Sequence, residues 1–168
     1  MRRLFVVLTV ALVGTAMVAG PATAKEPKDP KKAKKDIEQA YACFLSAELN
    51  YTIEQKLACV AGTDDPELLT TATELQQANA AAAAVTEAEI TKIKFKGDKK
   101  AVVTWDLLIG GDPVLPDQLG GAVFVKDEET GKRVWKVSAL TLCNLFSLAN
   151  PAITTSGPCA DIIANDTI

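Results

Sequence analysis

The hydrophobic pattern of this chain changes from helical to strand periodicity near its middle. Across residues 33–50, apolar positions recur every three or four residues and form one stripe, which predicts a helix. Two further helix starts follow. Thr52 and Gln55 have the form of a capping box, and Asp65 offers an N-cap acceptor directly before Pro66, which the first helical position tolerates. The first half of the domain is therefore predicted to be helical.

Strand periodicity begins at Val85-Thr86 and is irregular at first. Gly97-Asp98 then supplies a hairpin turn, and residues 101–109 form the clearest strand of the sequence. One side of this strand is wholly apolar and must face the core. Residues 110–117 hold two glycines and two prolines and are predicted to form a long loop, after which Gly120-Gly121 leads back into strand.

Two more β-rich runs, residues 122–125 and 133–137, flank a tight bend at Gly131. The second run leads into a helix-spaced apolar stretch, residues 140–148, which carries Cys143. The fold class is therefore predicted to be α+β. N-terminal helices are expected to pack on one face of a curved four-stranded antiparallel sheet, followed by a short C-terminal helix.

Residues 1–24 have the form of a secretory signal peptide. Arg2-Arg3 precede an apolar run, and Ala22-Thr23-Ala24 offers a small-residue cleavage site. The run is shorter than the roughly 20 residues that a bilayer-spanning helix needs, and an uncleaved anchor is the alternative. We therefore expect a secreted protein, extracellular or in the cell envelope, with no transmembrane segment after signal removal. The predicted parts are a signal peptide (1–24), a lysine-rich disordered leader (25–35), an α+β domain (36–150) and an irregular tail tied by a disulfide (151–168).

Export would place the four cysteines in an oxidising compartment, where an even set favours disulfides. Three connectivities are open for four cysteines. The favoured one joins Cys43 to Cys59 and Cys143 to Cys159, because each pair is sixteen residues apart and would tie a helix to the segment after it. Closing a loop of that length is worth roughly 3 kcal/mol in the chain-entropy picture.

Charge is unevenly distributed along the chain. Between Lys25 and Lys35 there are six lysines against two carboxylates, whereas from Asp36 onward ten basic residues stand against nineteen acidic ones. We expect a solvated, extended leader. Such a leader can contact an anionic surface, either lipid headgroups or envelope polymer. Nucleic acid is not expected as a partner, because no stacking aromatic residues accompany the lysines.

Residues 101–110, the strand at 120–125 and the run Val134-Trp135-Lys136-Val137-Ser138 carry a resemblance to a known group. The chain resembles small exported actinobacterial proteins related to the mycobacterial low-molecular-weight secreted antigen, over roughly residues 36–149. The resemblance implies a cystatin-like roll, an architecture also found in nuclear transport factor two and ketosteroid isomerase. That group is described as secreted antigens without an assigned activity, so no catalytic residue is carried over.

A roll of this kind usually curls around a cone-shaped cavity that can take a small apolar ligand. Tyr41, Phe95 and Trp105 are the candidate lining residues, and the alternative is that their rings simply fill the space. Asp106 is the one carboxylate inside the best strand, and an isomerase-like base would have to lie buried in the cavity. Because Trp105 occupies the core side, we expect Asp106 on the opposite, exposed face.

No other catalytic, metal or cofactor site is expected. The chain has no histidine and every cysteine is assigned to a disulfide, so Ser–His and Cys–His nucleophile arrangements cannot be assembled. Asp64-Asp65 and residues 127–129 lack the spacing of a calcium loop, and we interpret them as a helix cap and a solvated hairpin tip. The sequence therefore predicts a protein that is not an enzyme.

Three functions remain open at this level. The first is a secreted binding or interaction module for an unknown partner. The second uses the same fold to hold a small apolar molecule in an open cavity, with or without chemistry. The third is adhesion to an anionic cell-envelope surface through the lysine-rich leader.

Overall fold

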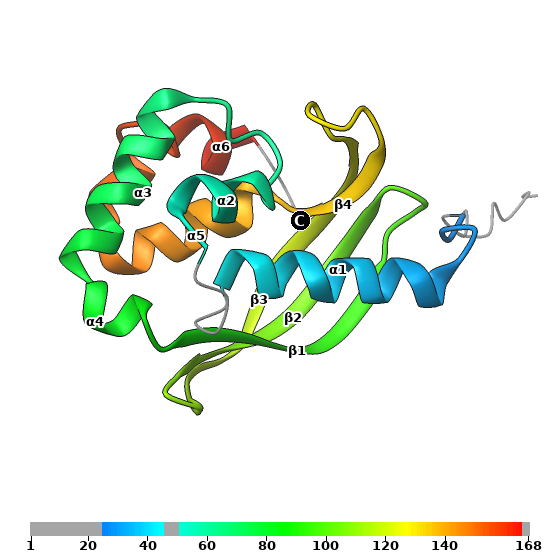
Figure 1. Ribbon diagram of the computed structural model, residues 1–168, viewed down its shortest axis with the longest axis horizontal. Coiled ribbons are helices and arrows are strands. Elements are labelled where there is room, and N and C mark those ends of the chain that lie inside the picture. Colours follow the sequence, from blue (N-terminus) through cyan, green and yellow to red (C-terminus); the bar gives the residue numbers. More distant parts are fainter. Residues whose placement is uncertain (1–24, 46–50, 166–168) are drawn as a thin grey trace, which may run out of the picture.

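The computed structural model of the chain describes residues 25–45 and 51–165, and the predicted signal peptide lies outside them (Figure 1). Six α-helices, one 3-10 helix and four strands are found within these ranges. In chain order they are α1 (Pro30–Leu45), α2 (Ile53–Ala58), α3 (Pro66–Ala78), α4 (Ala80–Ala83), β1 (Thr86–Phe95), β2 (Lys100–Ile109), β3 (Asp112–Lys126), β4 (Arg133–Val137), α5 (Ala139–Ala149), η1 (Pro151–Thr154) and α6 (Ala160–Asn165). Over the described ranges, no helix combines the length and the apolar character that a membrane crossing requires.

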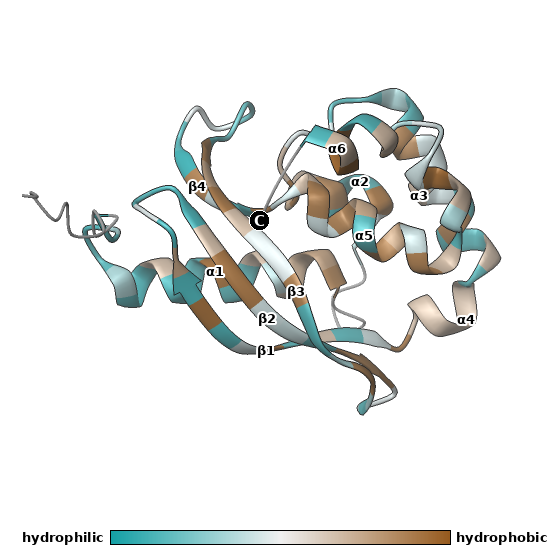
Figure 2. Ribbon diagram, turned by 180° about the vertical axis from the view of Figure 1, so that it is seen from behind, coloured by the Kyte–Doolittle hydropathy of each residue, from teal (hydrophilic) through white to brown (hydrophobic). Residues whose placement is uncertain are grey.

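The four strands form one antiparallel sheet in the order β1-β2-β3-β4. The sheet curls, and α1 crosses its inner face in contact with β1 and β4 (Figure 1). Helices α2, α3 and α5 gather beyond the end of α1 (Figure 1). Figure 2 shows the opposite face of the sheet, which no described helix covers. The predicted α+β class, with helices on one face of a curled four-stranded sheet, is confirmed.

The predicted helix starts at Thr52 and Asp65 are confirmed by their side-chain hydrogen bonds. The Thr52 hydroxyl accepts from the backbone N–H of Gln55, and the Gln55 side-chain oxygen accepts from the backbone N–H of Thr52. These two hydrogen bonds complete the capping box of α2. The Asp65 carboxylate accepts from the N–H of Glu67 at 2.8 Å, with Pro66 at the first position of α3. These caps satisfy N–H groups that a helix otherwise leaves without a partner.

Helix α1 begins earlier than predicted, at Pro30 instead of residue 33. The Asp29 carboxylate accepts from the N–H of Lys32 at 2.9 Å, which is an N-cap contact one residue before the proline. Four of the six leader lysines therefore lie on α1, and the disordered leader that we expected across residues 25–35 does not extend past Asp29.

The prediction of a long loop after β2 is wrong. Gly110 and Gly111, with φ of 62° and 87°, form a two-residue hairpin turn, and β3 starts directly at Asp112. The register between β2 and β3 shifts on either side of Leu107, and the nearby prolines fall in this irregular stretch of ladder. Bulged positions tolerate proline because they need no regular N–H donor, so a proline-containing sequence can still form a strand.

The C-terminal tail is also more regular than predicted. Residues 151–165 form η1 and α6 instead of an irregular segment. Asn150 caps η1 by accepting from the N–H of Ala152 at 3.2 Å, and Ile153 is buried against the core. Both disulfides have the pairing that the spacing favoured, Cys43–Cys59 and Cys143–Cys159, and the second joins α5 to the start of α6.

Candidate binding pocket

An apolar pocket of about 350 Å³ lies where the helices beyond α1 meet the sheet. It is bounded by α2, α3, α4 and α5, by the last turn of α1, and by the adjoining ends of β1, β2 and β3 (Figure 1). Twenty described residues line it, and sixteen of them are apolar. The apolar set is Phe44, Leu45, Ile53, Leu57, Ala72, Leu75, Ala82, Ala83, Leu107, Ile109, Leu115, Leu142, Leu145, Phe146, Leu148 and Ala149.

Two local features of the sequence build this pocket. Leu107 and Ile109 stand at the end of β2, where Leu107 is buried and Ile109 is half-buried, and both line the pocket. Eight of the eleven residues of helix α5 are apolar, and its Leu145 and Leu148 side chains line the pocket. Leu148 is 56% exposed although it lines the pocket, so the pocket reaches the molecular surface.

The four polar lining residues are Lys56, Gln76, Asn79 and Thr86. The Asn79 amide donates to the Leu75 carbonyl at 2.9 Å and the Thr86 hydroxyl donates to the Ala82 carbonyl at 2.7 Å, so both donors are occupied by backbone. Lys56 is the one charged residue among the described lining side chains, and its partial burial lowers the pKa of its ammonium group. The ion pairs found in the described part of the chain do not include it.

The three aromatic residues predicted to line a cavity do not line this pocket. Tyr41 of α1 and Trp105 of β2 are buried with ring centroids 6.0 Å apart, and the half-buried Phe95 packs on Trp135 at 5.9 Å. Tyr41 and Trp105 therefore pack as core residues between α1 and the sheet, which was the alternative for these rings. Large rings have many contact atoms and are usually packed on all sides, so aromatic character alone is a poor guide to a cavity wall.

A buried polar cluster surrounds Gly121, beside the Tyr41 and Trp105 rings. The Tyr41 hydroxyl donates to the Gly121 carbonyl at 3.2 Å, and the Gly121 N–H donates to the Thr141 hydroxyl at 2.7 Å. Burial raises the pKa of Tyr41. A Cβ on neighbouring Gly120 would meet the Tyr41 hydroxyl and would lie 2.9 Å from Trp105 Nε1. The glycine pair therefore permits the close approach of β3 to α1 and α5.

Asp106 lies on the sheet face away from the helices, as the strand alternation predicted, but it is half-buried instead of exposed. Its carboxylate accepts from the N–H of Asp117 at 2.7 Å, and Asp117 has a positive φ of 55°. Asn and Asp are among the few residues that adopt this backbone region, so the contact fixes the irregular stretch of β3. Asp106 thus does not face the pocket.

The acidic clusters act in caps and turns. Asp65 caps α3, and Asp127 accepts from the N–H and the hydroxyl of Thr130 within the β3–β4 turn. Hydrogen bonds from Thr130 and from the ammonium of Lys136, 2.9 Å away, lower the pKa of Asp127 to about 2. Within the described residues, no three His, Cys, Asp or Glu side chains are placed to hold a metal ion.

The fold and the pocket together define a small disulfide-bonded α+β domain with an open apolar pocket between its helices and one end of its sheet. A family model described as low molecular weight antigen MTB12, C-terminal domain, matches residues 30–153, and the chain belongs to this family. No curated protein and no solved structure matches the chain. The cystatin-like name therefore stays a prediction, whereas the resemblance to the low-molecular-weight antigens is confirmed at the level of the family.

The family match has the same start as the structural domain. It begins at Pro30, the first residue of α1, and ends at Ile153 inside η1. The matched region thus contains the whole sheet and all the helices that line the pocket. Cys159 and α6 lie outside it, so the second disulfide joins the family domain to a segment that the match does not cover.

Proposed function

We propose that this protein is an exported, non-enzymatic binding protein that holds one small apolar molecule in the pocket beside α5. The observation that carries the proposal is the lining, in which sixteen of twenty described residues are apolar and the polar ones are few. Small-molecule sites have this character, with volumes of roughly 300–1,000 Å³. At about 350 Å³ this pocket is near the lower limit, which fits a single hydrocarbon chain better than a lipid with two.

The chemistry of the lining favours a ligand with one anionic group. Lys56 is the only described cation at the pocket, and partial burial disfavours its charged form. A carboxylate placed beside it would restore a favourable environment for the ammonium. A fatty acid combines the apolar chain and the single negative charge, so long-chain carboxylates are the ligand class that we propose.

Several features support a binding role over catalysis. The chain contains no histidine, and all four cysteines are in disulfides, so neither of the usual nucleophile–base pairs can form. Asp106, the candidate isomerase-like base, faces away from the pocket and is held by a backbone hydrogen bond. The broader idea of an interaction module for a protein partner stays a prediction without a specific supporting contact.

The test is a displacement assay with a fluorescent acyl probe, competed by palmitate and by the uncharged hexadecanol. Ala83→Phe would project a large ring into the pocket from α4, and we expect it to weaken binding of both competitors at least tenfold, or about 1.4 kcal/mol. Ala81→Phe is the matched control, because Ala81 lies on the same helix, is exposed and does not line the pocket. Lys56→Met should weaken palmitate several-fold and leave hexadecanol unchanged.

The outcomes separate the parts of the proposal. Equal binding by Ala83→Phe and Ala81→Phe, or no saturable binding of either competitor, would contradict a ligand in this pocket. If Ala83→Phe weakens both competitors but Lys56→Met affects neither, the pocket is confirmed as the site and the assigned role of the lysine is wrong.

A further inference from the structure

Basic and acidic residues gather at different ends of the folded molecule. Fifteen of the sixteen lysines and arginines in the described part of the chain lie within residues 25–36, 92–100 and 126–136, together with seven carboxylates. The remaining described residues hold Lys56 alone against twelve carboxylates. The protein has a modest negative net charge of −3, and residues 92–100, with five lysines against Asp98 alone, form a second basic block in the sequence after the leader.

Strand pairing brings the second and third segments together. The Phe124 N–H donates to the Lys99 carbonyl at 2.8 Å, and Lys126 pairs with Arg133, so the β1–β2 and β3–β4 hairpins leave the sheet at the same end. The first turns of α1 lie beside the β1–β2 hairpin (Figure 1). We call the surface formed by residues 25–36, 92–100 and 126–136 the basic end.

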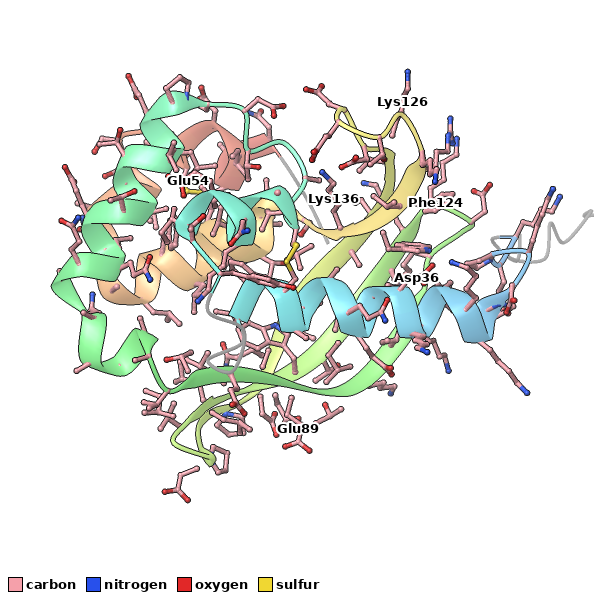
Figure 3. The ribbon with its side chains drawn as sticks, viewed as in Figure 1. Asp36, Glu54, Glu89, Phe124, Lys126 and Lys136 are labelled. Carbon is pink, nitrogen blue, oxygen red and sulfur yellow. A yellow bond between two sulfur atoms is a disulfide. The ribbon has the colours of Figure 1, made fainter. Side chains whose placement is uncertain are left out.

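The side chains of the basic end are available to a partner. All of its lysines and arginines are exposed except Lys136, which is half-buried. Only Lys32 and Lys136 form ion pairs within the described residues, with Asp36 and Asp127. Figure 3 shows Lys126 projecting outward beyond the β3–β4 hairpin, whereas Glu54 lies on α2 at the far side of the molecule. In Figure 2 the tips of both hairpins and the start of α1 are hydrophilic.

We propose that the basic end docks the protein onto the surface of an anionic lipid bilayer. Basic residues near such a surface contribute about 1 kcal/mol each, and the attraction acts over a Debye length of about 10 Å. The large exposed hydrophobic side chains, which are Tyr51, Val85, Val114, Leu119 and Leu148, all lie outside the basic end. Contact is therefore electrostatic, with no side chain inserted into the acyl region.

A planar partner fits the shape of the basic end better than a linear polymer does. Its three segments are the start of α1 and the β1–β2 and β3–β4 hairpins with the adjoining strand ends, and they lie at one end of the molecule (Figure 1). A flat surface can contact all three together. The acidic remainder of the protein is repelled by the same surface, so the charge division also fixes the orientation. The pocket is lined by the helices at the acidic end, which keeps its entrance away from the bilayer in this orientation.

The experiment measures partition of the purified protein onto phosphatidylcholine vesicles with and without 30% phosphatidylglycerol, at low and high salt. We expect partition onto the anionic vesicles only, lost at high salt. Neutralising the hairpins with Lys96→Gln, Lys99→Gln and Arg133→Gln should lower partition roughly a hundredfold. Neutralising α1 with Lys31→Gln, Lys34→Gln and Lys35→Gln should have a similar effect.

The matched control has the same change in net charge at the other end of the molecule. Thr70→Glu, Gln77→Glu and Ala81→Glu are exposed substitutions on α3 and α4, and we expect them to change partition less than threefold. Thermal denaturation of every variant checks that the fold is retained.

Four outcomes would overturn the proposal. Unchanged partition by the hairpin variant would assign binding to the lysine segment of α1 alone. Equal losses of partition in all three variants would show that partition depends on net charge alone and not on the basic end. Binding to soluble polyphosphate without binding to vesicles would point to an anionic polymer. A dimer that the hairpin variant dissociates, with no vesicle binding, would show that the basic end meets the acidic end of a second copy.

Discussion

Substitution of Gly120 by alanine tests the packing that joins β3 to the helices. The new methyl group would meet the Tyr41 hydroxyl and would lie 2.9 Å from Trp105 Nε1 and 3.0 Å from Thr141 Cγ2. Gly120 has no positive φ, so the cost is steric and does not come from the backbone conformation. These three neighbours are all buried and belong to different elements, so none can move without disturbing α1, β2 or α5.

The expected cost of Gly120→Ala follows from three contributions. Overpacking a core site costs roughly 1–3 kcal/mol. Displacing the Tyr41 hydroxyl from the Gly121 carbonyl leaves a buried polar group without a partner, at roughly 1–3 kcal/mol. The alanine stiffens the unfolded chain, which offsets roughly 0.4–1 kcal/mol. The net loss is about 3 kcal/mol, which corresponds to a fall in Tm of roughly 6–12 °C for a domain of this size.

Urea denaturation of a double-mutant cycle with Tyr41→Phe measures this contact directly. Removing the hydroxyl eliminates the closest clash, so Gly120→Ala should cost at least about 1 kcal/mol less in the Tyr41→Phe background than alone. Additive effects of the two substitutions, or a Gly120→Ala variant as stable as the unmodified protein, would refute the close approach that the structure shows.

Three further predictions concern the supports of the fold. Replacing Cys143 and Cys159 together by alanine should lower the free energy of unfolding by about 2–4 kcal/mol in urea titrations, because the bridge restrains the unfolded chain. Thr52→Ala should lower it by about 1 kcal/mol through loss of the α2 cap, and unchanged stability would argue against the capping box. The pKa of Asp127 is about 2, below its ordinary value of 3.8, so its stabilising contribution is present above pH 4 and is lost as pH falls toward 2. Thermal scans from pH 2 to pH 5 should therefore show a smaller acid-induced decrease in Tm for Asp127→Asn, and parallel curves would contradict this assignment.

Local signals in the sequence predicted most of the secondary structure. The caps at Thr52 and Asp65 depend on short hydrogen bonds between neighbouring residues, and the alternation of residues 101–109 reflects a strand with one buried side. The first half of β3 was missed because its glycines and prolines indicate a loop, and the register irregularities that accommodate them depend on pairing with β2.

The pocket could not be located from the sequence. Its lining residues come from eight elements, and a leucine that bounds an open space has the same periodicity as one that is packed on all sides. Tyr41 and Trp105 were predicted to line a cavity because they are large aromatic residues, but they occupy core positions. The grouping of the lysines in space could not be predicted from the sequence either, since only strand register shows that Lys99 and Lys126 lie at one end of the sheet.

A titration of the isotopically labelled protein with palmitate, followed by the backbone amide NMR signals, tests the proposed function most directly. The account predicts saturable shifts that concentrate around the pocket, at Lys56, Ala83, Leu145 and Phe146, while the amides of the two hairpins at the basic end stay in place. Shifts confined to the basic end, or no saturation at all, would contradict a ligand-binding pocket in this protein.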